Sequence, residues 1–96
     1  MANLASKYRE KTLIARDRMG DELYEHLIDL VEDAANKGRF RTQWDATSYV
    51  VMALPSPERV AYERAIRMLT NEGFKVSESA TFHNLLTISW EDAHND

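Results

Sequence analysis

Three basic side chains stand close together near the middle of the chain, and their chemistry suits the recognition of phosphate or carboxylate groups. Lys37, Arg39 and Arg41 occupy alternate positions. A guanidinium group can hold an oxyanion through two parallel hydrogen bonds and can also stack on a planar base. Aromatic residues further along the chain could supply more stacking surface. The candidate ligand-binding residues are therefore Lys37, Arg39, Arg41, Trp44, Tyr49 and Trp90.

The same basic cluster has two other interpretations. Two sets of side chains alternate through residues 39–44, namely Phe40, Thr42 and Trp44 on one side and Arg39, Arg41 and Gln43 on the other. This is the period-2 pattern that is typical of a half-buried strand. The arginines would then only make the outward strand face soluble, with Trp44 and Trp90 in the core. Alternatively, an acidic protein partner would meet the same arginines.

A second cluster is acidic. Glu22, His26, Asp29 and Asp33 recur at spacings of four, three and four residues, which places them on one side of a helix. Glu22, His26 and Asp29 could hold a divalent cation, as a metal-dependent nucleotide hydrolase requires. The solvated side of any amphipathic helix shows the same spacing, and no second acidic helix completes a metal site. The residues that could instead contact a protein partner, with DNA-like negative charge, are Glu22, Glu25, Asp29, Glu32 and Asp33.

Other catalytic motifs are missing from the sequence. The chain has no cysteine, and its three histidines, at positions 26, 83 and 94, fall in no zinc-binding pattern. Its three glycines form no phosphate-binding loop. We therefore expect a protein that is not an enzyme and that carries neither a metal nor a cofactor.

Length and charge narrow the class of protein. Ninety-six residues suffice for one domain, and an apolar fraction of 44% is typical of a globular fold. The net charge of −4 disfavours DNA as a partner. The longest apolar run, residues 49–54, is too short to cross a membrane, and no signal peptide is recognisable. A cytoplasmic protein is expected.

Two helical segments are predicted. The first covers residues 1–37, which carry an apolar stripe at helical spacing. Gly20 is a plausible break, so this segment forms either one bent helix or two. The second covers residues 57–72 and has a similar stripe. The residues that cap or end these helices are Gly38, Ser56, Pro57 and Gly73.

Strands are predicted for residues 39–54, as one kinked strand or a hairpin, and for residues 74–77 and 85–90. A crossover makes the first strand parallel to the second, and the last strand pairs antiparallel beside it. We expect an α+β fold, a small α-β(β)-α-β-β two-layer sandwich with a three- to four-stranded sheet and helices on one face. The chain would be a single domain, 1–96, with a helical arm, 1–20, and a frayed acidic tail, 91–96.

The charges of the first helical segment are arranged in blocks. Residues 1–20 hold five basic and two acidic residues, whereas residues 21–36 hold six acidic residues and no Lys or Arg. If two such helices pack antiparallel, the basic block of one meets the acidic block of the other. A homodimer is therefore expected.

The order of the elements resembles that of small accessory proteins encoded by tailed bacteriophages. In those proteins a helix ends in Gly-Phe or Gly-Tyr, a strand follows, and the chain closes on Ile-Ser-Trp. The matching stretches here are 33–40, 69–76 and 85–90, within a resemblance that covers about residues 22–92. The resemblance implies a phage-encoded protein that works in the host cytoplasm, and it supplies no catalytic residues.

The leading hypothesis is a non-enzymatic binding protein that inhibits or modulates a host or anti-phage defence protein by stoichiometric binding. The acidic helix and the uncovered face of the sheet are its two candidate contact surfaces. One alternative is a sponge that sequesters a phosphate-containing, nucleotide-type signal molecule through the basic cluster. The other alternative is the metal-dependent nucleotide hydrolase.

Overall fold

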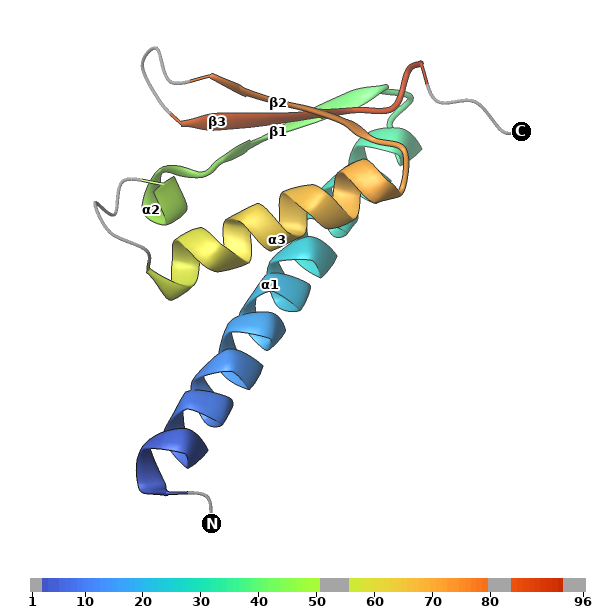
Figure 1. Ribbon diagram of the computed structural model, residues 1–96. Helices are drawn as coiled ribbons and strands as arrows, with labels where there is room; N and C mark the ends of the chain where they lie inside the picture. The colour runs from blue at the N-terminus through green and yellow to red at the C-terminus, as the bar shows by residue number, and fades with distance from the viewer. Residues whose placement is uncertain (1–2, 51–55, 80–83, 93–96) are drawn as a thin grey trace.

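The computed structural model describes residues 3–50, 56–79 and 84–92 (Figure 1). One three-stranded sheet forms a layer, and the two long helices pack on one face of it. The α+β class and the helices on a single face, as predicted, are therefore confirmed. In chain order the elements are α1 (Leu4–Asn36), β1 (Arg41–Asp45), α2 (Thr47–Val50), α3 (Pro57–Asn71), β2 (Lys75–Ser79) and β3 (Leu85–Ser89).

The 33 residues of α1 form one continuous helix. The first helical segment is therefore one helix and not two. The Asn3 side chain accepts a hydrogen bond from the N–H of Ser6 and caps the start. At the other end Gly38 has φ 78°, which a residue with a side chain rarely adopts. The N–H of Arg39 then reaches back to the carbonyl of Ala34 at 2.9 Å, which completes a Schellman motif.

The prediction that a strand resumes after the kink or turn is wrong for residues 49 and 50, since residues 47–50 are helical. They form the short helix α2, because the Asp45 carboxylate accepts a hydrogen bond from the N–H of Thr47 at 2.9 Å and turns the chain. The ring of Tyr49 is thereby brought to 5.3 Å from that of Trp44. Residues 51–54, the rest of the predicted strand, lie outside the described residues.

The second long helix, α3, begins and ends where its capping residues predict. The Ser56 hydroxyl accepts a hydrogen bond from the N–H of Arg59 at 3.1 Å, with Pro57 in the first turn. Gly73 has φ 95°, and the N–H of Phe74 donates to the carbonyl of Leu69 at 3.1 Å. The same motif thus ends both long helices and directs the chain into the sheet.

The sheet has the strand order β1-β3-β2, with β3 antiparallel to both neighbours. The strands β1 and β2 are therefore parallel to each other, as the crossover predicts, and β3 lies between them. The central strand is the most buried, and Leu86 and Ile88 on its inner face are fully buried. Together with Leu27 of α1 and Leu69 of α3 they form the centre of the core.

Phe40 departs from its predicted place in a half-buried strand. It precedes the first residue of β1 and is 57% exposed. Its backbone carbonyl still accepts a hydrogen bond from Trp90 at 3.0 Å, so it continues the pairing of the strands. Its ring stays exposed because it stands in the bend between α1 and β1, past the last turn of the helix.

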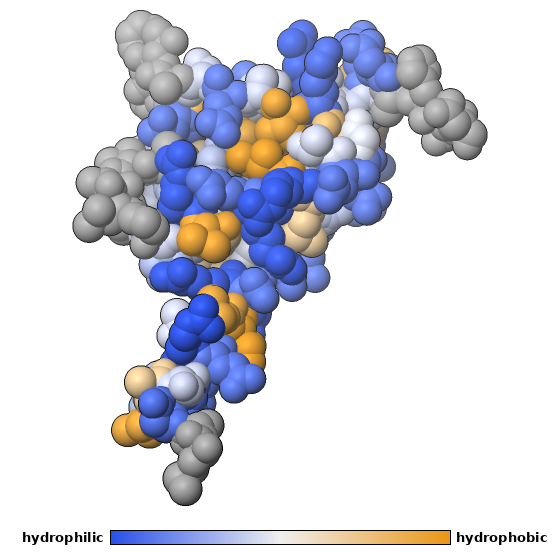
Figure 2. All heavy atoms as spheres, in the orientation of Figure 1, coloured by the Kyte–Doolittle hydropathy of each residue, from blue (hydrophilic) through white to orange (hydrophobic). Residues whose placement is uncertain are grey.

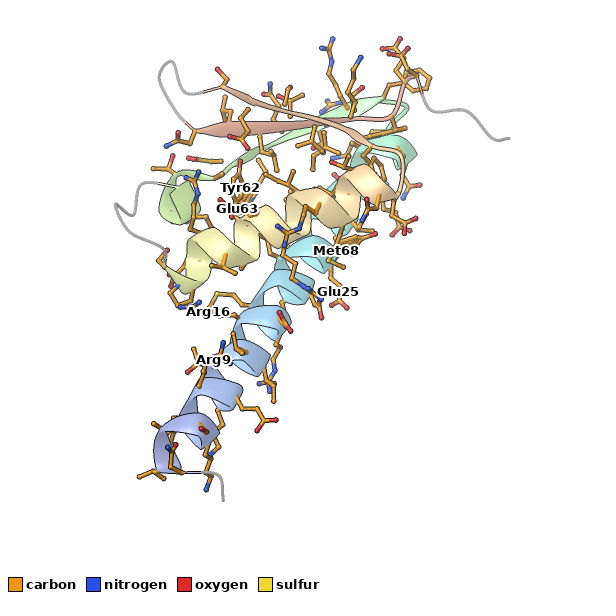
Figure 3. The ribbon with its side chains drawn as sticks, viewed as in Figure 1. Arg9, Arg16, Glu25, Tyr62, Glu63 and Met68 are labelled. Carbon is orange, nitrogen blue, oxygen red and sulfur yellow. The ribbon has the colours of Figure 1, made fainter. Side chains whose placement is uncertain are left out.

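One buried ionisable group links α3 to the edge of the sheet. Tyr62 is buried, and desolvation raises its pKa above the ordinary value for a tyrosine, assisted by the charge of Glu78 and a hydrogen bond to it. The unfolded chain therefore loses this proton before the native state does, so stability falls as the pH rises above about 10. Figure 3 shows Tyr62 on the side of α3 that faces the sheet.

Substitution of Tyr62 tests this linkage. In urea unfolding from about pH 9 to about pH 11, the wild-type protein should lose up to about 1.4 kcal/mol of unfolding free energy per pH unit more than Tyr62→Phe does. Other titrating groups contribute equally to both proteins. Equal slopes for the two proteins would contradict a buried, protonated Tyr62.

Candidate binding surfaces

In the described part of the chain the outer face of the sheet carries no helix, and most of its side chains are polar. The register places Arg41, Ser89 and Lys75 in one row across the three strands. Gln43, Thr87 and Ser77 form the next row, and the Gln43 amide lies 3.4 Å from the Thr87 hydroxyl. These side chains alternate with the inward apolar ones because successive residues of a strand point to opposite faces.

Two arginines occupy one corner of this face. The Schellman motif that ends α1 fixes the backbone of Arg39, and the pairing with Ser89 fixes that of Arg41. With Thr42 and Gln43 they line an open hollow of about 480 Å³. Among residues 3–50, 56–79 and 84–92, no carboxylate forms an ion pair with either arginine.

The backbone beside the hollow is also available. The N–H of Trp90 bonds to Phe40 and the N–H of Ala46 bonds to Asn84, so the even-numbered residues of β1 carry the bonds to β3. The N–H and C=O groups of Arg41 and Gln43 therefore point away from β3. No other described strand pairs with this edge.

The two lysines nearest this corner in the chain and in the sheet register, Lys37 and Lys75, have acidic neighbours. The Lys37 ammonium lies 3.0 Å from a carboxylate oxygen of Asp33, one helical turn away. The Lys75 ammonium lies 3.9 Å from Asp92, and both side chains are about four-fifths exposed. Exposed pairs of this kind are weak and are screened by salt. Arg39 and Arg41 are thus the stronger sites for an incoming anion.

The aromatic residues proposed for stacking do not join the arginines. Trp44 lies on the inner face of β1, between the ring of His26 at 6.3 Å and that of Tyr49 at 5.3 Å. Trp90 packs edge-on against Phe74 at 6.2 Å. Trp44, Tyr49 and Trp90 all pack against the core, so they serve folding.

The acidic residues lie where the helical spacing predicts. All five candidates for contact with a protein partner are exposed on α1, and Figure 3 labels one of them, Glu25. They are Glu22, Glu25, Asp29, Glu32 and Asp33. Within the described residues, no group of three or more His, Asp or Glu side chains is arranged to hold a metal ion. Glu22, His26 and Asp29 thus gather into no metal centre, although they share one side of the helix.

The predicted helical arm, residues 1–20, carries a further surface. The N-terminal part of α1 projects beyond α3 and the sheet (Figure 1), and residues 3–15 are all exposed. Apolar side chains lie bare on this arm, as the orange atoms on it show in Figure 2. Their exposed fractions are 66% for Leu4, 55% for Tyr8, 42% for Leu13 and 55% for Ile14. The apolar spacing here was visible in the sequence, but only the structure shows that none of the described elements covers it.

The base of the arm is tied to α3. The Arg64 guanidinium lies 3.2 Å from Asp21 and 3.8 Å from Asp17. Its aliphatic stem packs directly on Gly20. These contacts fix the direction in which the arm leaves the domain.

Comparison of the chain with family models, with curated proteins and with solved structures finds no match. None of the helices in the described part of the chain combines the length and the apolar character that a membrane span requires. The arguments for function therefore come from the surfaces themselves.

Proposed function

We propose that this is a non-enzymatic binding protein that attaches to an acidic surface of another protein through the outer face of its sheet. The observation that carries the proposal is the corner formed by Arg39 and Arg41, which lies on an uncovered sheet face with no carboxylate paired to it in the described residues. An acidic partner would supply the missing charge, since complementary charge selects partners and orients them.

The neighbouring side chains favour a flat macromolecular contact. Short hydroxyl side chains, those of Ser77, Thr87 and Ser89, lie in the same two rows of the face as Arg41 and Gln43. The unpaired backbone groups of Arg41 and Gln43 add hydrogen-bonding capacity at the edge of β1. A partner segment that carries carboxylates and runs along this edge would meet both kinds of group.

The finer proposal concerns the identity of the partner. The resemblance of residues 22–92 to small accessory proteins of tailed phages supports a phage-encoded protein that inhibits or modulates a host or anti-phage defence protein. Binding of this kind is stoichiometric and needs no catalytic residue.

A second candidate function rests on the hollow beside Arg39 and Arg41. A phosphate group would fit the two guanidinium groups, which is the chemistry that a nucleotide sponge needs. The base would lack a stacking partner there, because Trp44 and Tyr49 lie on the other face of the sheet. Phosphate recognition is thus supported, whereas base recognition is not.

Reversal of the two arginine charges tests the proposal. The variant Arg39→Glu/Arg41→Glu should bind a partner captured from bacterial lysate at least about ten-fold more weakly than wild type does, because it sets like charges against each other. The control is Arg9→Glu/Arg67→Glu, which makes the same charge change at exposed residues outside this face. Quantitative mass spectrometry followed by titration of the purified partner measures the effect.

The outcomes separate the two candidates. Equal loss in the test and control variants would contradict a binding site at the corner. Calorimetry with ADP-ribose and with cyclic nucleotides supports the sponge if heat is released with wild type and lost with Arg39→Glu/Arg41→Glu. If no protein is captured above background and no nucleotide binds, both candidates fail.

A further inference from the structure

The protein has more accessible surface than a compact chain of its size. Its accessible area is 7267 Å², whereas a compact monomer of 11.1 kDa exposes roughly 5,700 Å². The excess is about twice the 800 Å² that each partner buries in a standard protein interface. The exposed arm, residues 3–15, contributes to this excess and carries bare apolar side chains that a second copy would cover.

The charges along α1 form one stripe. Lys7, Lys11 and Arg18 are followed by Glu22, Asp29 and Asp33, at successive spacings of 4, 7, 4, 7 and 4 residues. Spacings of four and seven return to the same side of a helix. All six side chains are exposed.

This stripe lies on the side of α1 opposite to the core. The buried residues of the helix begin at Gly20 and continue through Leu23, Leu27 and Val31, half a turn away from the charges. Arg16 belongs to the other side as well, since its Nε atom is buried. A second helix can therefore approach the charged stripe without displacing α3 or the sheet.

The positions of the charges are symmetrical about residue 20. Lys7 and Asp33 are each 13 residues from Gly20, Lys11 and Asp29 are each nine, and Arg18 and Glu22 are each two. An antiparallel partner helix centred at the same residue would therefore set every one of these cations opposite one of the anions.

We infer that two copies of this chain form an antiparallel dimer along α1, with a two-fold axis beside Gly20. In each half of the dimer, the basic arm of one protomer lies along the acidic section of its partner. Leu4, Tyr8 and Ile14 cover the aliphatic stems of the acidic side chains opposite them. Each protomer contributes the same surface, as a closed two-fold interface requires.

Complementary variants test this register. Lys11→Glu/Arg18→Glu makes the stripe wholly acidic except for Lys7, and Glu22→Lys/Asp29→Lys makes it wholly basic except for Asp33. In analytical ultracentrifugation the wild type should be a dimer at tens of micromolar. Each variant alone should dimerise at least about 30-fold more weakly, and their equimolar mixture should form a heterodimer.

The matched control is Arg9→Glu/Arg67→Glu, whose charges lie outside the stripe and which should remain dimeric. A monomeric wild type, whatever else then binds the arm, would overturn the inference. Failure of the two folded variants to associate in the mixture would also overturn the inference. Formation of the heterodimer, in contrast, shows that misfolding is not the cause of the weak dimerisation of each variant alone. Circular dichroism of each variant confirms that it is folded.

A distance measurement tests the direction of the helices. The chain has no cysteine, so Ser6→Cys provides a single spin-label position. In the antiparallel dimer the two labels are separated by 28 helical positions, which is about 42 Å at 1.5 Å per residue. A parallel dimer would bring them within about 20 Å, and that result would refute the proposed geometry. The variant Arg39→Glu/Arg41→Glu should leave this dimer unchanged. Failure of the dimer proposal is therefore distinguishable from failure of the proposed function.

Discussion

Replacement of Leu27 by alanine should lower the free energy of unfolding by about 3 kcal/mol. Leu27 is fully buried and lies in α1 within the core cluster that includes Leu69, Leu86 and Ile88. The substitution removes apolar contacts with both layers and leaves a cavity. A small domain is stable by only about 5–10 kcal/mol, so the urea midpoint should fall by a third or more.

The matched control is Leu13→Ala, on the same helix. Leu13 is 42% exposed on the arm, and its truncation should change the unfolding free energy by less than about 0.5 kcal/mol. The two variants should be compared at the same low protein concentration, because the proposed dimer would add to stability. Equal losses would contradict the division of α1 into a core section and a free arm.

The apolar periodicity of the sequence was sufficient to predict the core section of α1. Leu23 and Leu27 recur at the spacing that a buried helical stripe requires, and both are buried. The helix ends were equally predictable, because Gly38 and Gly73 adopt the positive φ angles that favour glycine. The N-cap at Ser56 was predictable from the position of this serine directly before Pro57.

The errors arise where tertiary contacts override local preference. Residues 47–50 include Tyr49 and Val50, which favour strands, yet the Asp45 side chain turns the chain and a short helix follows. Phe40 fits the alternating pattern but stands in a bend, where its ring remains exposed. Neither the side-chain hydrogen bond nor the bend is visible in the apolar pattern.

The candidate ligand-binding residues show which part of a site the sequence pattern can predict and which part it cannot. Strand alternation alone sets Arg41 and Trp44, which are three residues apart, on opposite faces. The structure follows this rule, so the phosphate-binding and stacking groups of the proposed nucleotide site are separated by the sheet. The spacing in the sequence was therefore sufficient to predict the basic corner, whereas the strand order that sets Ser89 and Lys75 beside Arg41 required the structure.

Substitution of Gly20 should have the second large effect, and its cause is the close contact between α1 and α3. A Cβ atom at this position would lie 2.6 Å from Cδ and 3.2 Å from Cβ of Arg64. Gly20→Leu should therefore lower the unfolding free energy by about 2–3 kcal/mol, because it overpacks the helix contact. Urea unfolding measures this loss. A neutral Gly20→Leu would mean that Arg64 moves aside without cost.

A double-mutant cycle separates the contact from the helix itself. Arg64→Ala removes the Cγ and Cδ atoms that crowd Gly20, along with the ion pairs to Asp17 and Asp21. In that background Gly20→Ala should stabilise the protein by about 1 kcal/mol, since alanine favours a helix interior more than glycine does. In the wild-type background the same change should be destabilising, so the two substitutions are coupled. The same sign in both backgrounds would instead mean that Gly20 is only a weak point in the helix, as its sequence position suggested.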